Sequence, residues 1–140
     1  MTTLHADLAF IQNVLDAAPF HRWLGMKAAS IENDTLRLVV PWREELVSNP
    51  RLQSAHGGVL AAIIDLGGFY ALIATGNMPA ATADLRVDYH APALPGTLLA
   101  DCKVVRIGAT LSVGEVSIRN EAGELLASGR GAYLMQRSKS

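Results

Sequence analysis

The sequence predicts an α+β fold in which a curved antiparallel β-sheet wraps around one long helix. Residues 57–75 form a run that is apolar on every side, and such a helix has to be buried all round. Two β-like segments precede this run and four follow it, with short turns between them. Short connections favour antiparallel neighbours, and only a strongly curved sheet covers most sides of a central helix.

The N-terminal part begins with a short amphipathic helix. Apolar residues recur at helical spacing over residues 7–18, and a proline ends the pattern. The stretch PFHRWLGM, residues 19–26, is expected to form a packed connection. Residues 26–30 and 35–40 then alternate as two strands around an Asn-Asp turn.

The rest of the chain supplies the remaining strands of the sheet. Residues 42–55 are rich in charge and then in turn-forming residues, so we expect a loop there. After the buried helix, tight connections (PALPG, IGA and NEAG) separate β segments, and the last of them is a hairpin signal. We expect these segments to run as an antiparallel meander, over residues 81–91, 97–107, 110–120 and 125–136.

The composition limits the classes of protein to which the chain can belong. A length of 140 residues favours one domain, residues 1–140. The 12 basic and 13 acidic residues give a net charge of −1, which excludes the basic footprint of a nucleic-acid-binding protein. Half of the residues are hydrophobic and 18% are charged, so we expect part of the surface to be buried between subunits.

Other features bear on the cellular compartment. The single cysteine, Cys102, forms no intrachain disulfide, which favours the cytoplasm, and its β-rich surroundings indicate a small core residue. The N-terminus has no basic segment before an apolar core, so no secretory signal is expected. Residues 57–76 are long enough to span a membrane, but their five glycines and central acid argue against it.

The start of the long helix carries the first candidate site. His56 and Gly57 stand at its mouth, where the first backbone N–H groups have no intrahelical partner and carry partial positive charge. Glycine there lets a ligand approach closely. The place suits a carbonyl oxygen that becomes negative during a reaction, and it also suits a phosphate.

The second candidate is Asp65, the single charge inside the apolar run. It lies eight residues beyond Gly57, about 12 Å along a helix, so one substrate carbonyl cannot touch both groups of one chain. If both serve one site, Asp65 comes from a second chain, and two antiparallel helices form a two-fold dimer with composite sites. The alternative is structural: Gly-Gly is then only a tight helix start, and Asp65 pairs with an arginine.

At these residues the chain resembles a hotdog-fold thioesterase of the phenylacetic-acid-degradation type, the PaaI-like group. The resemblance runs through PFHRWLGM, NPRLQSAHGGVLAAIID, TADLRVDYHAP, VVRIG and GELLASGRGAYL. The specific part is HGG followed by an acid in the buried helix. The resemblance implies a hotdog fold, a homodimer that often pairs into a homotetramer, and hydrolysis of acyl-CoA thioesters without metal or cofactor.

The resemblance also implies residue roles. The Gly57 amide would polarise the thioester carbonyl, and Asp65 of the facing chain would activate water or attack directly. His56 would orient the site, and Thr82 would help to place the water. The group commonly has an asparagine six residues before the histidine; here Pro50 stands there, and a one-residue bulge would restore Asn49. An Asn-Pro turn is the alternative for Asn49.

Contacts with the coenzyme A part of the substrate need cations near its phosphates and a backbone that the substrate can approach closely. The candidates are Gly58, Arg86, Lys103 and Arg106, with surface salt bridges as the alternative for the charged ones. Candidates for the acyl tunnel are Leu60, Ile64, Phe69 and Tyr70, for a medium-chain or aryl acyl group. The sequence assigns no role to His5, His21 or His90.

Other functions compete with the thioesterase prediction. A hydratase or dehydratase of acyl thioesters on this fold usually carries a histidine five residues after its acid, and this chain lacks one there. A non-catalytic acyl-CoA-binding protein could keep HGG and Asp65. Only an assay separates that alternative from an active thioesterase.

Overall fold

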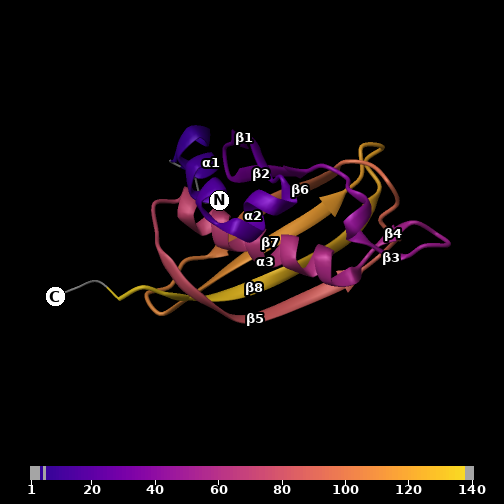
Figure 1. Ribbon diagram of the computed structural model, residues 1–140. Coiled ribbons are helices and arrows are strands. Elements are labelled where there is room, and N and C mark those ends of the chain that lie inside the picture. Colours follow the sequence, from indigo (N-terminus) through magenta and orange to yellow (C-terminus); the bar gives the residue numbers. More distant parts are fainter. Residues whose placement is uncertain (1–3, 5, 138–140) are drawn as a thin grey trace.

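The long apolar run forms helix α3 (Gly57–Ala74), which lies in the concave face of a six-stranded antiparallel sheet in this computed structural model (Figure 1). The structure describes residue 4 and residues 6–137. The predicted α+β fold with a sheet wrapped around a central helix is confirmed.

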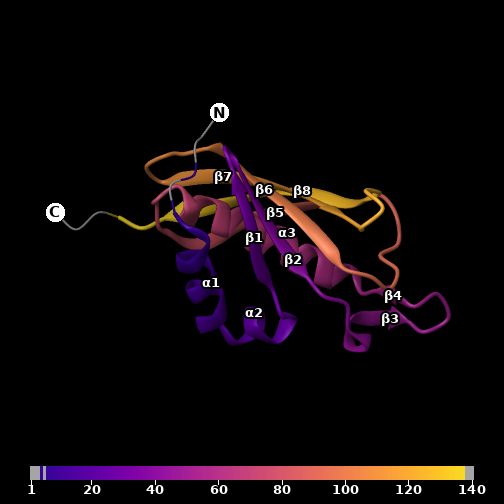
Figure 2. The ribbon, with the colours of Figure 1, turned by 90° about the horizontal axis from the view of Figure 1, so that it is seen from above.

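The sheet has the spatial order β1-β2-β6-β7-β8-β5. Its strands are β1 (Lys27–Glu32), β2 (Thr35–Val40), β5 (Pro79–Tyr89), β6 (Leu98–Arg106), β7 (Leu111–Arg119) and β8 (Leu125–Met135). Helix α1 (Leu8–Ala17) matches the predicted N-terminal helix, and the Asp7 side chain caps it by accepting from the Phe10 amide at 2.8 Å. Figure 2 shows α1 beside β1, at the end of the sheet away from β5.

Two segments contain short elements that the sequence did not predict, and the expectation of a loop over residues 42–55 was wrong in part. The packed connection at residues 19–26 contains helix α2 (Pro19–Leu24), because Pro19 fits the first helical position and Gly25, at φ 69°, ends the helix in the left-handed region. The loop at residues 42–55 contains a 3-10 turn, η1 (Glu44–Leu46), and a hairpin of two short strands, β3 (Val47–Asn49) and β4 (Ser54–Ala55).

The expected meander is also wrong for one of its four strands. β6, β7 and β8 follow one another in the sheet, but β5 pairs with β8 at the far edge, and β6 pairs with β2. The connection over residues 90–97 has to cross about 14 Å, three strand spacings, and eight residues reach up to about 26 Å. A short connection therefore did not exclude a crossover.

Helix α3 approaches the sheet at its glycine pair. A Cβ atom at Gly67 would lie 2.7 Å from the Sγ atom of Cys102, and one at Gly68 would overlap the Tyr133 hydroxyl. Cys102 is fully buried, as expected for a core residue, and burial raises the pKa of its thiol. Only glycine permits this separation between the helix and the strands.

One side of α3 is not covered by the rest of the chain. The expectation that the helix is buried on all sides was therefore wrong for a single chain. By length and composition α3 could cross a membrane, but 56% of it is buried inside the molecule. The uncovered stripe consists of half-buried residues in its first two-thirds: Val59, Ala61, Ala62, Asp65, Leu66 and Phe69. Asp65 is the only charged member of this stripe.

We predict that Gly68→Ala lowers the free energy of unfolding by about 1–3 kcal/mol, measured by urea denaturation, because the added methyl group overlaps the Tyr133 hydroxyl. In a Tyr133→Phe background the same substitution should cost less, since the hydroxyl is gone. Helix propensity alone favours alanine by about 1 kcal/mol. A Gly68→Ala protein more stable than wild type would therefore contradict the close contact.

Candidate active site

The start of α3 presents one free amide. His56 caps the helix, and its Nδ1 atom accepts a hydrogen bond from the Gly58 N–H at 2.8 Å. The Gly58 amide, a predicted substrate contact, is therefore already engaged. Among the described residues the Gly57 N–H has no acceptor, so it is the amide that can polarise a carbonyl.

Tyr89, at the end of β5, covers this helix start and was missed by sequence reasoning. Its hydroxyl donates to the Gly57 carbonyl at 2.7 Å, and a Cβ atom at Gly57 would lie 3.3 Å from the Tyr89 ring. The sequence around Tyr89 does not predict this contact, because the contact depends on β5 running antiparallel to α3 beside it.

Asp65 is held from both its side chain and its backbone. Its Oδ1 atom accepts a hydrogen bond from the Thr82 hydroxyl at 2.7 Å, and its carbonyl accepts from the buried Tyr133 hydroxyl at 2.7 Å. The structure thus brings together Asp65 and Thr82, two predicted site residues. In the described part of the chain no arginine pairs with Asp65, and its Oδ2 atom has no hydrogen-bond partner.

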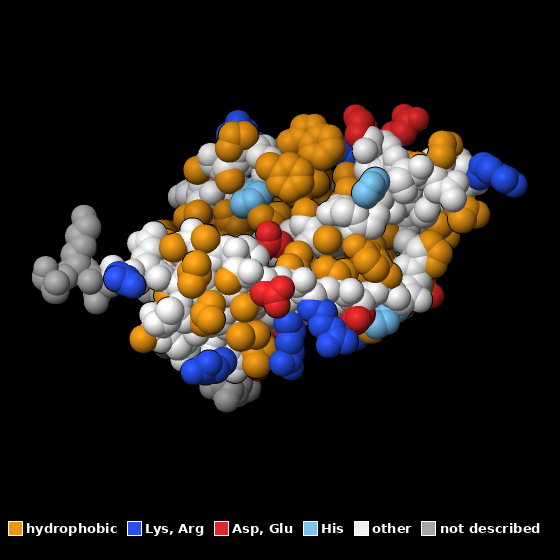
Figure 3. All heavy atoms as spheres, turned by 90° about the horizontal axis from the view of Figure 1, so that it is seen from below, with side chains coloured by type: hydrophobic (Ala, Val, Ile, Leu, Met, Phe, Trp, Pro, Cys, Tyr) orange, Lys and Arg blue, Asp and Glu red, His pale blue; other side chains and the backbone are white. Residues whose placement is uncertain are grey.

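A pocket of about 280 Å3 opens beside this carboxylate. It is lined by His21, Asp65, Leu66, Phe69, Ala81 and Thr82. On the face that Figure 3 shows, hydrophobic side chains surround a histidine and an acidic side chain that lie near one another. Of the four residues expected to line an acyl tunnel, only Phe69 lines this pocket. The other three are buried in the core: Leu60, Ile64 and Tyr70.

His21 is the second residue that sequence reasoning missed. It lies on α2, and its Nδ1 atom is 3.0 Å from the hydroxyl of Tyr70. Burial lowers the pKa of His21, while the negative charge of Asp65 raises it by a smaller amount. The motif PFHRWLGM was noted in the sequence, but only the packing of α2 against α3 shows that its histidine faces Asp65.

Asn49 serves its own loop in the single chain. Its Oδ1 atom accepts from the backbone amides of Arg51, at 3.1 Å, and Leu52, at 3.4 Å. This is the geometry of the Asn-Pro turn alternative. A catalytic role for Asn49 stays a prediction.

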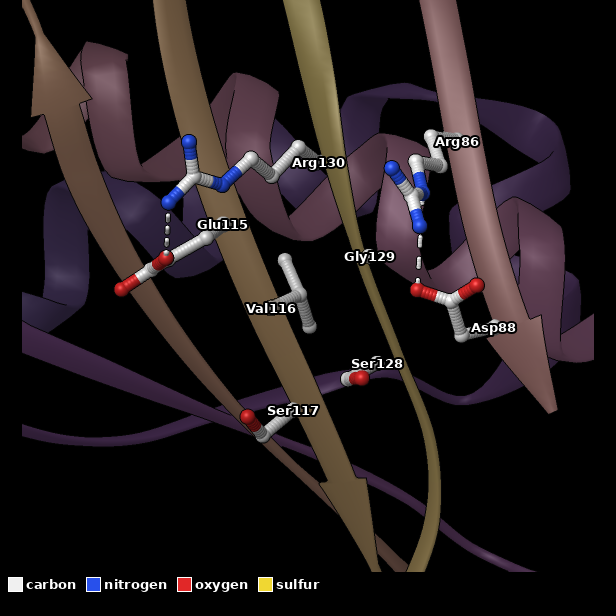
Figure 4. Close-up of a pocket in the computed structure, with 8 residues that line it drawn as sticks. All are labelled: Arg86, Asp88, Glu115, Val116, Ser117, Ser128, Gly129 and Arg130. Carbon is white, nitrogen blue, oxygen red and sulfur yellow. Dashed lines mark hydrogen bonds and ion pairs between the residues drawn. The ribbon is translucent and has the colours of Figure 1, made fainter. Parts of the chain in front are cut away.

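The predicted coenzyme A cations do not form one cluster. Arg86 pairs with Asp88 at 3.5 Å and lines a hollow of about 410 Å3 over β5, β7 and β8, with α3 behind these strands in Figure 4. In the same hollow Arg130 pairs with Glu115 at 3.4 Å. Lys103 lines a different hollow, beside β1 and β2, and Arg106 lines neither. The hollow lined by Arg86 and Arg130 is polar, and both arginines are paired with carboxylates. The pocket beside Asp65 is therefore the better place for an acyl group.

The remaining histidines add no second site. His90 contacts the Ser128 hydroxyl at 2.8 Å through Nε2, on the far side of β5 from Asp65, and His5 lies outside the described residues. Within the described ranges, no three His, Cys, Asp or Glu side chains are grouped to hold a metal ion.

A hotdog fold with a free amide at the start of its central helix and a carboxylate further along is the arrangement expected of a thioesterase. The sequence model of the thioesterase superfamily matches residues 52–127. A protein of Halobacterium salinarum, provisionally named an esterase, is 34% identical over 95% of this chain and 96% of its own length. The chain belongs to the thioesterase superfamily.

More distant relatives agree with this assignment. The medium/long-chain acyl-CoA thioesterase YigI of Escherichia coli is 27% identical over 84% of this chain and 85% of its own length. A solved structure from Shewanella oneidensis, of a protein related to the thioesterase superfamily, is 27% identical, with a TM-score of 0.79 over 92% of this chain and 95% of that one. The Escherichia coli PaaI structure, 22% identical over 95% of this chain and 99% of its own, shares the fold with a TM-score of 0.80.

We predict that Asp65→Asn lowers the pKa of His21 further, because the carboxylate that favours the charged imidazolium is removed. The measurement is an NMR titration of the His21 Cε1 proton. Asp84→Asn, on the exposed part of β5, is the matched control and should leave this pKa unchanged. A His21 pKa that does not respond to Asp65→Asn would show that the two side chains do not face one pocket.

Proposed function

We propose that the protein is an acyl-CoA thioesterase that hydrolyses its substrate to a free acid and coenzyme A. The observation that carries the proposal is the Asp65 carboxylate, held at Oδ1 by Thr82 and open at Oδ2, beside a pocket with an apolar wall. A free carboxylate oxygen next to an acyl-sized pocket is what hydrolysis of an acyl ester requires.

The Gly57 amide is the proposed oxyanion donor. It would donate to the thioester oxygen, where negative charge develops, and the partial positive charge of the helix start adds to this stabilisation. The His56 ring fixes the neighbouring backbone through its bond to Gly58. Because His56 accepts that bond at Nδ1, its neutral form carries the proton on Nε2, as a donor on the exposed side.

Asp65 would act through Oδ2. As a general base it takes a proton from water while the water oxygen bonds to the carbonyl carbon; the C–S bond then breaks and coenzyme A leaves as the thiolate. As a nucleophile, Oδ2 itself bonds to that carbon and water cleaves the resulting anhydride. Thr82 holds the other carboxylate oxygen in both cases, so the reacting oxygen is the same.

The site would be shared between two copies of the chain, because Gly57 and Asp65 lie about 12 Å apart on one helix. The edge of β5 supports a homodimer: the strand is 11 residues long, has β8 as its neighbour on one side only, and is exposed from Ala80 to Asp84. The uncovered stripe of α3 supports it further. Ala61 is midway between Gly57 and Asp65, so two antiparallel helices crossing there would place each Asp65 opposite the partner's amide.

A dimer of dimers is proposed for the outer face of the sheet. Val105, Leu111 and Leu134 are large apolar side chains exposed there, at 42%, 40% and 43%.

The cytoplasm is the proposed compartment, because Cys102 is a free, buried thiol, and free thiols are usual in a reducing compartment. Medium-chain and aryl acyl groups both fit a pocket of this size.

We predict that the wild-type protein hydrolyses at least one ester in a panel of acetyl-, hexanoyl-, decanoyl-, palmitoyl-, benzoyl- and phenylacetyl-CoA, and that Asp65→Asn loses about 100- to 10,000-fold in kcat, because it removes the reacting oxygen. Loss of thioester absorbance is the measurement, with Asp16→Asn, on the exposed part of α1, as the matched control. An Asp65→Asn protein as active as wild type would contradict the mechanism. A folded wild type that binds these esters without turnover would point to a binding protein instead.

We predict that mixed oligomers reveal the shared site. Gly57→Pro removes the amide proton at a position where proline fits, since the first helical residue tolerates it and His56, at φ −59° and ψ 133°, has the backbone that precedes proline. Gly57→Pro should lose about 100- to 1,000-fold in kcat, and Gly57→Ala, which adds the same crowding against Tyr89 but keeps the N–H, should lose far less.

Refolding equal amounts of the Asp65→Asn and Gly57→Pro proteins together should restore about a quarter of the wild-type activity. Half of the dimers are then mixed, and each holds one intact site of two. Sites built within one chain would give no recovery at all.

A further inference from the structure

The His21 ring is held in one orientation by its surroundings. It lies 5.5 Å from the Tyr70 ring and 6.2 Å from the Phe20 ring, both edge to face, and its Nδ1 atom contacts the Tyr70 hydroxyl at 3.0 Å. Tyr70 is 2% exposed, so its hydroxyl sits inside the core. Because these contacts with Tyr70 and Phe20 hold the ring, it presents a defined edge to the pocket.

The buried hydroxyl decides which nitrogen of His21 carries the proton. Within the described part of the chain the Tyr70 hydroxyl has His21 as its only hydrogen-bond partner. If Nδ1 were the donor, the hydroxyl proton would be buried without an acceptor, which is costly. Tyr70 therefore donates to Nδ1, and the neutral imidazole carries its proton on Nε2, at the opposite side of the ring.

That Nε2–H faces the space beside the carboxylate. His21 and Asp65 line the same pocket, and no hydrogen bond or ion pair joins them, so Nε2–H is left without a protein acceptor. The rest of the lining is mainly apolar, with Leu66, Phe69 and Ala81. Among the described side chains that line the pocket, the Thr82 hydroxyl donates to Asp65, and His21 is thus the one donor that no protein group uses.

We propose that His21 is a specificity-determining residue: its Nε2–H donates a hydrogen bond to an oxygen on the acyl group, and the site prefers oxygen-bearing acyl groups over plain hydrocarbon ones. This inference rests on the proposed thioesterase function. Coenzyme A is too large for a pocket of about 280 Å3, so the pocket receives the acyl end of the substrate. Tyr70 is the positioning residue, since it acts by fixing the proton of His21.

A site that offers a buried donor discriminates against a ligand that lacks the acceptor, because the donor is then left unpaired. The effect should be seen as a ratio between two substrates of nearly equal size rather than in overall activity. Loss of packing around α2 would slow both substrates alike and leave the ratio unchanged.

The experiment compares kcat/KM for 2-, 3- and 6-hydroxyhexanoyl-CoA with that for hexanoyl-CoA. The wild type should favour at least one hydroxylated ester by about 3- to 10-fold. His21→Leu should bring that ratio to about 1, and His21→Gln, whose amide N–H stands near the Nε2 position, should retain most of it. Tyr70→Phe should give an intermediate ratio, because either nitrogen of His21 can then carry the proton.

Two outcomes would overturn the inference: a wild type without preference for any hydroxylated ester, or a ratio that His21→Leu leaves unchanged. Because His21→Gln and Tyr70→Phe are each compared with wild type, the test holds even if His21→Leu does not fold. Hydrolysis with an unchanged ratio contradicts the His21 role alone. If no ester is hydrolysed, the thioesterase proposal fails, and the same ratio is measured from dissociation constants by calorimetry, which tests His21 separately.

Discussion

The close contact between α3 and the sheet is the constraint on which the rest of this structure depends. Gly67 and Gly68 allow the strands to approach so far that Cys102 and Tyr133 occupy the space of a β-carbon. At this distance the Tyr133 hydroxyl reaches the Asp65 carbonyl. The packing that closes the core therefore also fixes the position of the one acidic side chain on the open side of the helix.

Strand β5 connects the two halves of the proposed chemistry. Its Thr82 holds the Asp65 carboxylate, and its Tyr89 covers and bonds to Gly57. The same strand is the exposed edge of the sheet, where a second copy would pair. Pairing of two copies along β5 would thus fix the subunit contact on the same strand that holds the carboxylate and covers the helix start. A composite site and an edge-strand dimer would then depend on one strand.

Polar groups at the site are divided between those already satisfied and those left free. His56 uses the Gly58 amide and leaves that of Gly57, and Thr82 uses one oxygen of Asp65 and leaves the other. Helix α2 adds a third such arrangement, since Tyr70 occupies one nitrogen of His21. Each neighbour fixes an orientation, so the free atom beside it points in a defined direction at little entropic cost.

The sequence by itself determined the central helix, the six strands of the main sheet with the pairings β1-β2, β6-β7 and β7-β8, and the pair His56-Gly57 with Asp65. It could do so because apolar periodicity and a helix-start motif are local properties. Only the tertiary structure decided the crossover of β5, the contacts of Thr82 and Tyr89, and the place of His21 opposite Asp65. These depend on which strand edge stays open and on how closely two glycines let a helix approach a sheet. Such contacts join residues up to 68 positions apart, and no pattern along the chain encodes them.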